Sequence, residues 1–110
     1  MSESIDDIKN RLIKYTEKDI KFLKSQWQQW IKEKKFDLIE QKTGANIQAV
    51  YDIFNPSKIK NIEPAKYSPD RYEIRLHHGA RFEIVVIILF DKPEKGDLGI
   101  VTYYKRLISN

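Results

Sequence analysis

Residues 71–90 read RYEIRLHHGARFEIVVIILF, with one glycine between two apolar runs. In residues 71–77 apolar side chains occupy every second position, and charged side chains or histidine occupy the others, which is typical of a half-buried strand. Residues 81–90 predict a second strand, and residues 78–80 predict a turn between the two. This stretch therefore predicts an antiparallel hairpin, and its second strand is central because both faces are apolar beyond Glu83.

The rest of the chain places helices before this hairpin and one strand after it. The charged link DKPEKGD leads to a third strand at residues 98–107, while residues 55–70 hold three of the four prolines and predict a loop with a brief strand at 59–62. Residues 4–54 show the three-and-four spacing of amphipathic helices, the longest across residues 16–31.

This order of elements predicts an α+β fold in a single domain, residues 1–110. We expect two to three N-terminal helices, packed on a C-terminal antiparallel sheet of three to four strands within residues 71–107.

Composition narrows the class of protein. The chain has no cysteine, which excludes disulfides and thiolate metal sites, and its two adjacent histidines make a poor metal set. No apolar run approaches the length that spans a bilayer, and the acidic N-terminus lacks the apolar core of a secretory signal. We therefore expect a cytoplasmic protein with no cofactor, no metal and no membrane partner.

Arginine is concentrated in the C-terminal part of the chain. Four of the five arginines fall there, namely Arg71, Arg75, Arg81 and Arg106, and the net charge is +4. The planar guanidinium group binds phosphate through two parallel hydrogen bonds. This distribution favours RNA as a partner of the predicted sheet.

Strand pairing predicts a cluster of polar side chains on one face of that sheet. Keeping apolar residues opposite one another sets Arg75 opposite Glu83 and His77 opposite Arg81. Pairing Phe90 with Leu98 then adds the C-terminal strand. One end of the face would collect Arg75, His77, Arg81, Glu83, Tyr103 and Lys105.

These groups have the chemistry of metal-independent RNA cleavage. Glu83 would take the proton of the 2′-hydroxyl, His77 would protonate the leaving 5′-oxygen, and Arg81 would stabilise the phosphorane charge. Substrate binding would fall to Arg75, Tyr103, Lys105 and Arg106. The sequence thus predicts a small basic RNA-binding domain and leaves open whether it cleaves RNA.

The same residues fit other function classes. Arg75, Glu83 and Lys105 also suit a cross-strand ion-pair ladder, in which each pair contributes about 1 kcal/mol or less. The apolar stripe on the same face, made of Val85, Ile87, Leu89 and Val101, would then predict a non-catalytic protein-interaction module, including a homodimer. A nucleic-acid-binding module without catalysis is the remaining alternative.

The C-terminal part also resembles a known class of enzymes. Its segments VYDIFNPSKIKNIEP, RYEIRL, RFEIVVIILFD and LGIVTYYKR are similar to the helix, NP turn and curled antiparallel sheet of the barnase–EndoU–colicin–RelE class of small toxin-type ribonucleases, most of all the phage-associated and BrnT-like branches. The resemblance covers roughly residues 20–107. It implies a RelE-like, metal-independent endoribonuclease of a toxin–antitoxin pair, held silent by an antitoxin.

Carried over by position, the resemblance assigns the strand arginines to Arg75 and Arg81, and the closing basic strand to residues 102–106, TYYKR. One departure concerns the early helix, where the phage-associated branch usually carries a histidine and arginines. This chain has KSQWQQWIKEKK there, with Gln26 and Gln29. Either the hairpin histidines replace the missing group, or the chain keeps the fold without the reaction.

Overall fold

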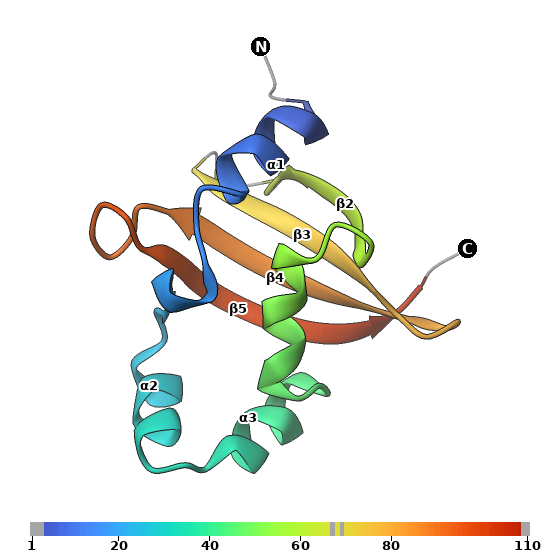
Figure 1. Ribbon diagram of the computed structural model, residues 1–110. Coiled ribbons are helices and arrows are strands. Elements are labelled where there is room, and N and C mark those ends of the chain that lie inside the picture. Colours follow the sequence, from blue (N-terminus) through green and yellow to red (C-terminus); the bar gives the residue numbers. More distant parts are fainter. Residues whose placement is uncertain (1–3, 67, 69, 109–110) are drawn as a thin grey trace.

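The structure is a computed structural model that describes residues 4–66, 68 and 70–108 (Figure 1). Its elements are α1 (Ile5–Leu12), η1 (Glu17–Asp19), β1 (Ile20–Phe22), α2 (Ser25–Lys32), α3 (Phe36–Thr43), η2 (Ile47–Phe54), β2 (Ile59–Pro64), β3 (Arg71–His78), β4 (Phe82–Phe90) and β5 (Leu98–Leu107), where η marks a 3-10 helix. The predicted α+β fold is confirmed.

The sheet has five strands in the order β1-β5-β4-β3-β2, with β4 at the centre. Neighbours from β2 to β5 are antiparallel, whereas β1 is parallel to β5. The long strands β3, β4 and β5 run side by side across the middle of Figure 1. The prediction of a purely antiparallel sheet of three to four strands was therefore wrong in its detail, because the described sheet is mixed and has five.

Strand β1 lies where the sequence predicts the long helix across residues 16–31. The capping pair of Thr16 and Asp19 is present, but it begins only a single 3-10 turn. The chain then extends, and the Leu23 N–H donates to the Ile100 carbonyl at 2.9 Å. Pairing with β5 satisfies backbone groups that a helix would have satisfied internally. The helix itself begins only at Ser25.

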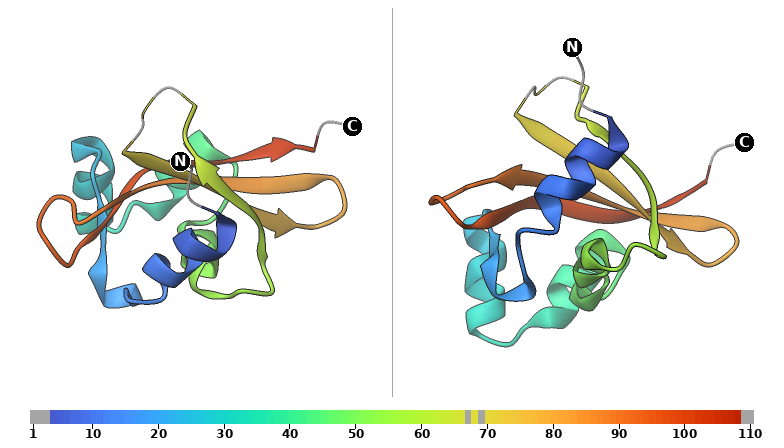
Figure 2. Two further views of the ribbon diagram at one scale, coloured as in Figure 1. Left: turned by 90° about the horizontal axis from the view of Figure 1, so that it is seen from above. Right: turned by 45° about the horizontal axis from the view of Figure 1, so that its top comes forward.

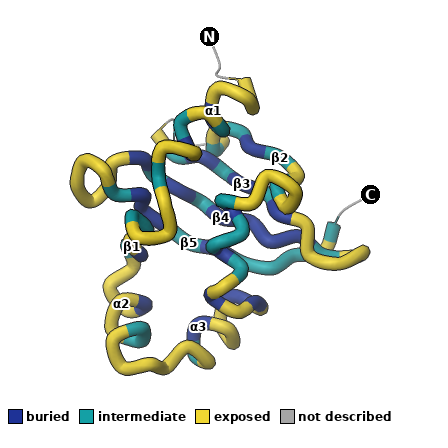
Figure 3. Tube along the Cα trace, in the orientation of Figure 1, coloured by how far each residue is buried: buried dark blue, intermediate teal, exposed yellow. Residues whose placement is uncertain are grey.

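Helices cover one face of the sheet. In Figure 1, α1 and η2 lie in front of the strands, while α2 and α3 extend past β5, on the side of the sheet where the short β1 pairs with it. The two views of Figure 2 agree with this arrangement. Their apolar side chains and the inward residues of the strands form one core, which includes Ile8, Leu12, Trp27, Ile39, Val50, Ile53, Ile74, Ile84, Ile88 and Ile100. In Figure 3 the buried residues concentrate along β3, β4 and β5.

The β3–β4 hairpin has the predicted faces but a different register. His77 lies opposite Glu83 and Arg75 opposite Val85, so the turn consists of residues 79–81. Gly79 opens this turn with φ 73°, a left-handed backbone that glycine adopts without a steric penalty. The predicted pairs Arg75–Glu83 and His77–Arg81 were wrong. Because the slip is by two positions, every side chain within the strands keeps its predicted face.

A bulge in β5 decides which C-terminal side chains share a face with Glu83. Phe90 pairs with Leu98 as predicted and Ile88 pairs with Ile100, but Ile87 pairs with Thr102. Residue 101 is therefore an extra residue, and the residues after it lie on the opposite face from the one that a regular ladder predicts. As a result, residues 103 and 105 point toward the helices, whereas residues 102, 104 and 106 point away from them.

Candidate nucleic-acid interface

The sheet face opposite the helices, which we call the open face, consists of alternate residues from four strands. The left view of Figure 2 shows α1 and η2 on the other side of the sheet. Lys60 reaches the open face from β2. The other members include Asn61, Glu63, Arg71, Glu73, Arg75, His77, Glu83, Val85, Ile87, Leu89, Thr102, Tyr104 and Arg106.

Glu83 is the buried centre of the polar part of this face. Its Oε1 accepts a hydrogen bond from Lys60 Nζ at 2.9 Å, its Oε2 accepts one from Arg106 Nε at 2.6 Å, and its side chain is only 5% exposed. Burial alone would raise the pKa of Glu83, but the hydrogen bonds and charges of Lys60 and Arg106 outweigh burial and lower that pKa below its ordinary value. Glu83 is therefore a carboxylate that anchors two cations at neutral pH.

Arg75 is held in place by two other glutamates. Its Nε donates to Glu73 Oε2 at 3.1 Å, and its Nη2 donates to Glu63 Oε1 at 2.7 Å. The hydrogen bond to Glu73 and the charges of the nearby carboxylates raise the pKa of Arg75 despite partial burial. The guanidinium group is thus fixed in orientation and always charged.

Arg75 and Arg106 border a depression of about 400 Å³ on the open face, together with Glu63, Pro64, Lys66 and Glu73. Their side chains are 32% and 37% exposed. Among the described residues, Glu83 is the side-chain hydrogen-bond partner of Arg106, through Nε, so its two Nη groups can donate to a ligand. The depression therefore presents two guanidinium groups to an anion.

Two further residues of β5 extend the open face beyond this depression. Tyr104 is half-buried and lies opposite Val85. Thr102 Oγ1 accepts a hydrogen bond from Lys24 Nζ at 3.1 Å. Because alternate residues of a strand are about 6.6 Å apart, Thr102, Tyr104 and Arg106 form a row about 13 Å long. This row combines a hydroxyl, an aromatic ring and a cation.

The structure brings together some of the predicted site residues and separates others. Arg75, His77, Glu83 and Arg106 share the open face, and His77 is exposed opposite Glu83. Arg81 lies in the exposed turn. Tyr103 and Lys105 lie on the helix-covered face. Their predicted place beside Glu83 was wrong, because the bulge at residue 101 reverses the C-terminal part of β5.

Tyr103 and Lys105 have contacts of their own on the helix-covered face. Tyr103 is buried, and its hydroxyl donates to the Ala45 carbonyl at 2.9 Å. The Lys105 ammonium group lies 4.4 Å from the centre of the Phe82 ring. Tyr103 is therefore part of the core, and Lys105 covers an aromatic ring on the helix-covered side.

Lys60, Lys66 and Tyr104 are members of the candidate site that the polar pattern of the hairpin does not predict. Lys60 falls in the brief strand predicted at 59–62, but nothing in the sequence indicates that this strand lies beside β3. Tyr104 belongs to the TYYKR segment that the resemblance singles out. Choosing Tyr104 over Tyr103 from the sequence would require predicting the bulge at residue 101.

Replacing Glu83 with glutamine is expected to lower the free energy of unfolding by about 2 kcal/mol at pH 7, because two charge-assisted hydrogen bonds lose their anion. The folded-state pKa of Glu83 is lowered from 4.5, so its stabilising contribution is complete above that pH and is lost as the pH falls through the folded-state pKa. Urea unfolding should therefore show a difference between wild type and Glu83→Gln that shrinks below about pH 4.5.

Glu63→Gln is the matched control, because Glu63 also pairs with a cation but its side chain is 45% exposed. Exposed pairs contribute little, so this substitution should cost less than about 1 kcal/mol. Equal losses at positions 63 and 83 at pH 7 would contradict the central role of Glu83.

Within the residues that the structure describes, no group of three or more histidine, cysteine, aspartate or glutamate side chains is placed to hold a metal ion. In the same residues, no helix is long and apolar enough to cross a membrane. No protein-family model, no curated protein and no solved structure matches the chain. The geometry of the open face is therefore the basis for assigning a function.

Proposed function

We propose that the protein binds single-stranded RNA on the open face of its sheet. The observation that carries this proposal is the depression bordered by Arg75 and Arg106. Guanidinium groups bind phosphate through paired, charge-assisted hydrogen bonds. Because the neighbouring glutamates already hold both groups in place, little side-chain entropy is lost when a phosphate binds.

Tyr104 supports a single strand over a duplex. It lies next to Arg106 along the row on β5, so a base stacked on its ring would direct a neighbouring phosphate toward the guanidinium group. Unstacked bases of single strands can lie flat on an aromatic side chain of a sheet, whereas paired bases in a duplex cannot. The affinity should be moderate, because Glu63, Glu73 and Glu83 offset part of the positive charge.

The support for RNA cleavage is weaker than the support for RNA binding. A general base must come within hydrogen-bond distance of the 2′-hydroxyl. Glu83 is almost completely buried, and each of its carboxylate oxygens accepts a hydrogen bond from a cation. The toxin-type activity that the resemblance implies is RNA cleavage, and the antitoxin would serve only to silence that activity. We therefore propose binding without cleavage.

The test is the salt dependence of binding to a labelled single-stranded RNA of about 12 nucleotides, followed by fluorescence anisotropy. Arg75, Arg106 and Lys66 line the depression. Three phosphate contacts predict a slope of about −2 for log K against log salt, which is about a 20-fold loss of affinity between 50 and 200 mM. The RNA should stay intact with or without a chelator.

Two outcomes of this experiment would contradict the proposal. Affinity that does not change with salt would show that phosphate contacts do not drive binding. Cleavage products that appear with wild type and disappear with Glu83→Gln would show that the chain is a ribonuclease. Single-stranded DNA of the same sequence serves as the control for recognition of the 2′-hydroxyl.

A homodimer through the apolar stripe of the open face has less support. Val85 is buried within the monomer, and Ile87, Leu89 and Val101 are half-buried. The apolar area available to a partner is thus smaller than the sequence pattern predicts. A mass that rises with protein concentration in light scattering would favour the homodimer over RNA binding.

A further inference from the structure

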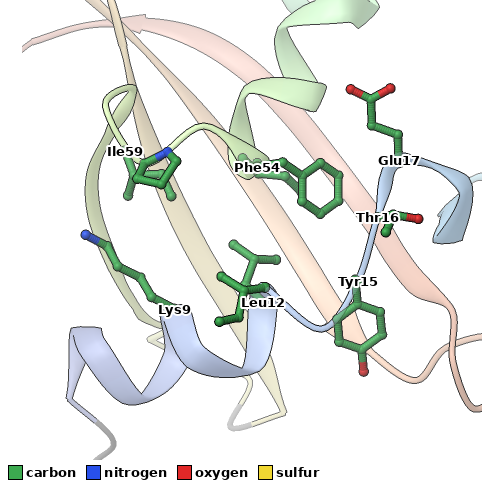
Figure 4. A pocket seen from close by; sticks show the side chains of 10 residues that line it. Lys9, Leu12, Tyr15, Thr16, Glu17, Phe54 and Ile59 are labelled. Carbon is green, nitrogen blue, oxygen red and sulfur yellow. The ribbon is translucent and has the colours of Figure 1, made fainter.

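A second, apolar cavity lies on the helical side of the molecule, away from the open face. It has a volume of about 330 Å³ and is formed where α1, the segment that follows α1, the end of η2 and the start of β2 meet (Figure 4). Volumes of this size are at the lower end of the range for small-molecule sites. Neither the core nor the proposed RNA interface requires an open cavity at this place.

The cavity has a buried apolar floor and an exposed rim. Leu12 and Ile53 are almost completely buried, and Phe54 and Ile59 are half-buried around them. Ile13, at the rim, is 73% exposed, which is the largest exposure among the large hydrophobic residues described. An apolar compound that entered the cavity would remove this surface from water.

Charged groups stand at opposite ends of this apolar floor. Figure 4 shows the Lys9 ammonium group at one end and the Glu17 carboxylate at the other, with Leu12 and Phe54 between them. No carboxylate of the described residues forms an ion pair with Lys9. The Lys9 end can therefore pair with an anion, whereas the Glu17 end repels one.

We propose that this cavity binds a small amphiphilic carboxylate, with its apolar chain on Leu12, Ile53 and Phe54 and its carboxylate at Lys9. The charge arrangement selects one orientation, because the reverse one would place the ligand carboxylate beside Glu17. The apolar floor supplies most of the affinity, and the Lys9 ammonium supplies the preference for an anionic head group.

The experiment titrates decanoate, and separately decanol, into the full chain labelled with carbon-13 in its methyl groups. We expect decanoate to shift the methyl signals of Leu12, Ile53 and Ile59, with a dissociation constant on the order of 100 µM. Decanol should bind at the same methyl groups about fivefold more weakly, because it lacks the charge.

Lys9→Gln should remove this preference, so that decanoate binds the variant no more tightly than decanol does. Lys14→Gln is the matched control. Lys14 is exposed and does not line the cavity, and its replacement changes the net charge by the same amount. Glu17→Gln should tighten decanoate binding about twofold, and it keeps the test decisive if Lys9→Gln does not fold.

Three results would overturn the proposal. The first is the absence of methyl shifts at millimolar decanoate. The second is equal binding of decanoate and decanol to wild type. The third is equal weakening by Lys9→Gln and Lys14→Gln, which would show that net charge, not the cavity, determines affinity. The readout does not involve RNA, so the outcome is independent of the proposed function.

Discussion

Tyr103→Ala is expected to lower the free energy of unfolding by about 4 kcal/mol, whereas Tyr104→Ala is expected to lower it by less than about 1 kcal/mol. Tyr103 is fully buried, its ring lies edge-on to Trp27 with centres 5.5 Å apart, and its hydroxyl donates to the Ala45 carbonyl. Tyr104 is half-buried on the open face. Urea unfolding monitored by tryptophan fluorescence measures both losses.

A loss of this size is a large part of the stability of a domain of this length, so Tyr103→Ala need not remain folded. Tyr103→Phe keeps the ring and removes only the hydroxyl. It should cost about 1 kcal/mol, because the buried Ala45 carbonyl loses the hydrogen bond from Tyr103 and keeps the one from the Thr43 hydroxyl. If Tyr104→Ala destabilises the protein as much as Tyr103→Ala does, the bulge at residue 101 is misplaced and the open face is composed of other residues.

The double variant Arg75→Gln/Arg106→Gln is expected to bind single-stranded RNA about 30-fold more weakly at 100 mM salt, since each arginine contributes about 1 kcal/mol to phosphate binding. The slope of log K against log salt should fall in magnitude by about 1.4, because two phosphate contacts are lost. Both quantities come from anisotropy titrations at several salt concentrations.

The matched control is Arg81→Gln/Lys105→Gln, which removes the same charge from the turn and from the helix-covered face. It should weaken binding less than about twofold, since long-range charge effects are screened at this salt concentration. Lys105 and Arg106 are adjacent in the sequence, so the comparison separates the two faces of one strand. Equal losses in the two double variants would mean that RNA responds to net charge alone.

The hairpin shows how much of the site could be predicted from the sequence. Alternation of apolar and polar residues places Arg75, His77 and Glu83 on one face, and it does so in the wrong register as well as in the right one, because the two differ by an even number of positions. The register itself depends on where Gly79 sits in the turn. The face on which each hairpin side chain lies was therefore predictable, but the residue that pairs with it across the two strands was not.

The C-terminal strand shows where alternation fails. Its sequence LGIVTYYKRL offers two tyrosines and two cations in adjacent pairs, so either member of each pair suits either face. Tertiary contacts determine which tyrosine is buried. Trp27 and Ala45 form a pocket for one tyrosine, and the extra residue at 101 places Tyr103 on the face that contacts this pocket. No residue type in the strand marks that bulge.

Strand β1 illustrates the same limit. Residues 16–31 have the apolar spacing of a helix, yet residues 20–22 pair with the exposed edge of β5. The edge of β5 has unpaired backbone groups, and these favour a strand over a helix at Ile20–Phe22. That edge comes from residues about 80 positions later in the chain, so the local sequence does not reveal it. Tertiary context here overrides the local pattern.

The most direct test of RNA binding on the open face is a methyl NMR titration with single-stranded RNA. Binding on the open face predicts shifts at the methyl groups of Ile87 and Leu89, which lie on that face, and none at those of Ile84 and Ile88, which lie beneath the helices. Shifts confined to Ile13 and Ile53 on the helical side, or no shifts at saturating RNA, would contradict it.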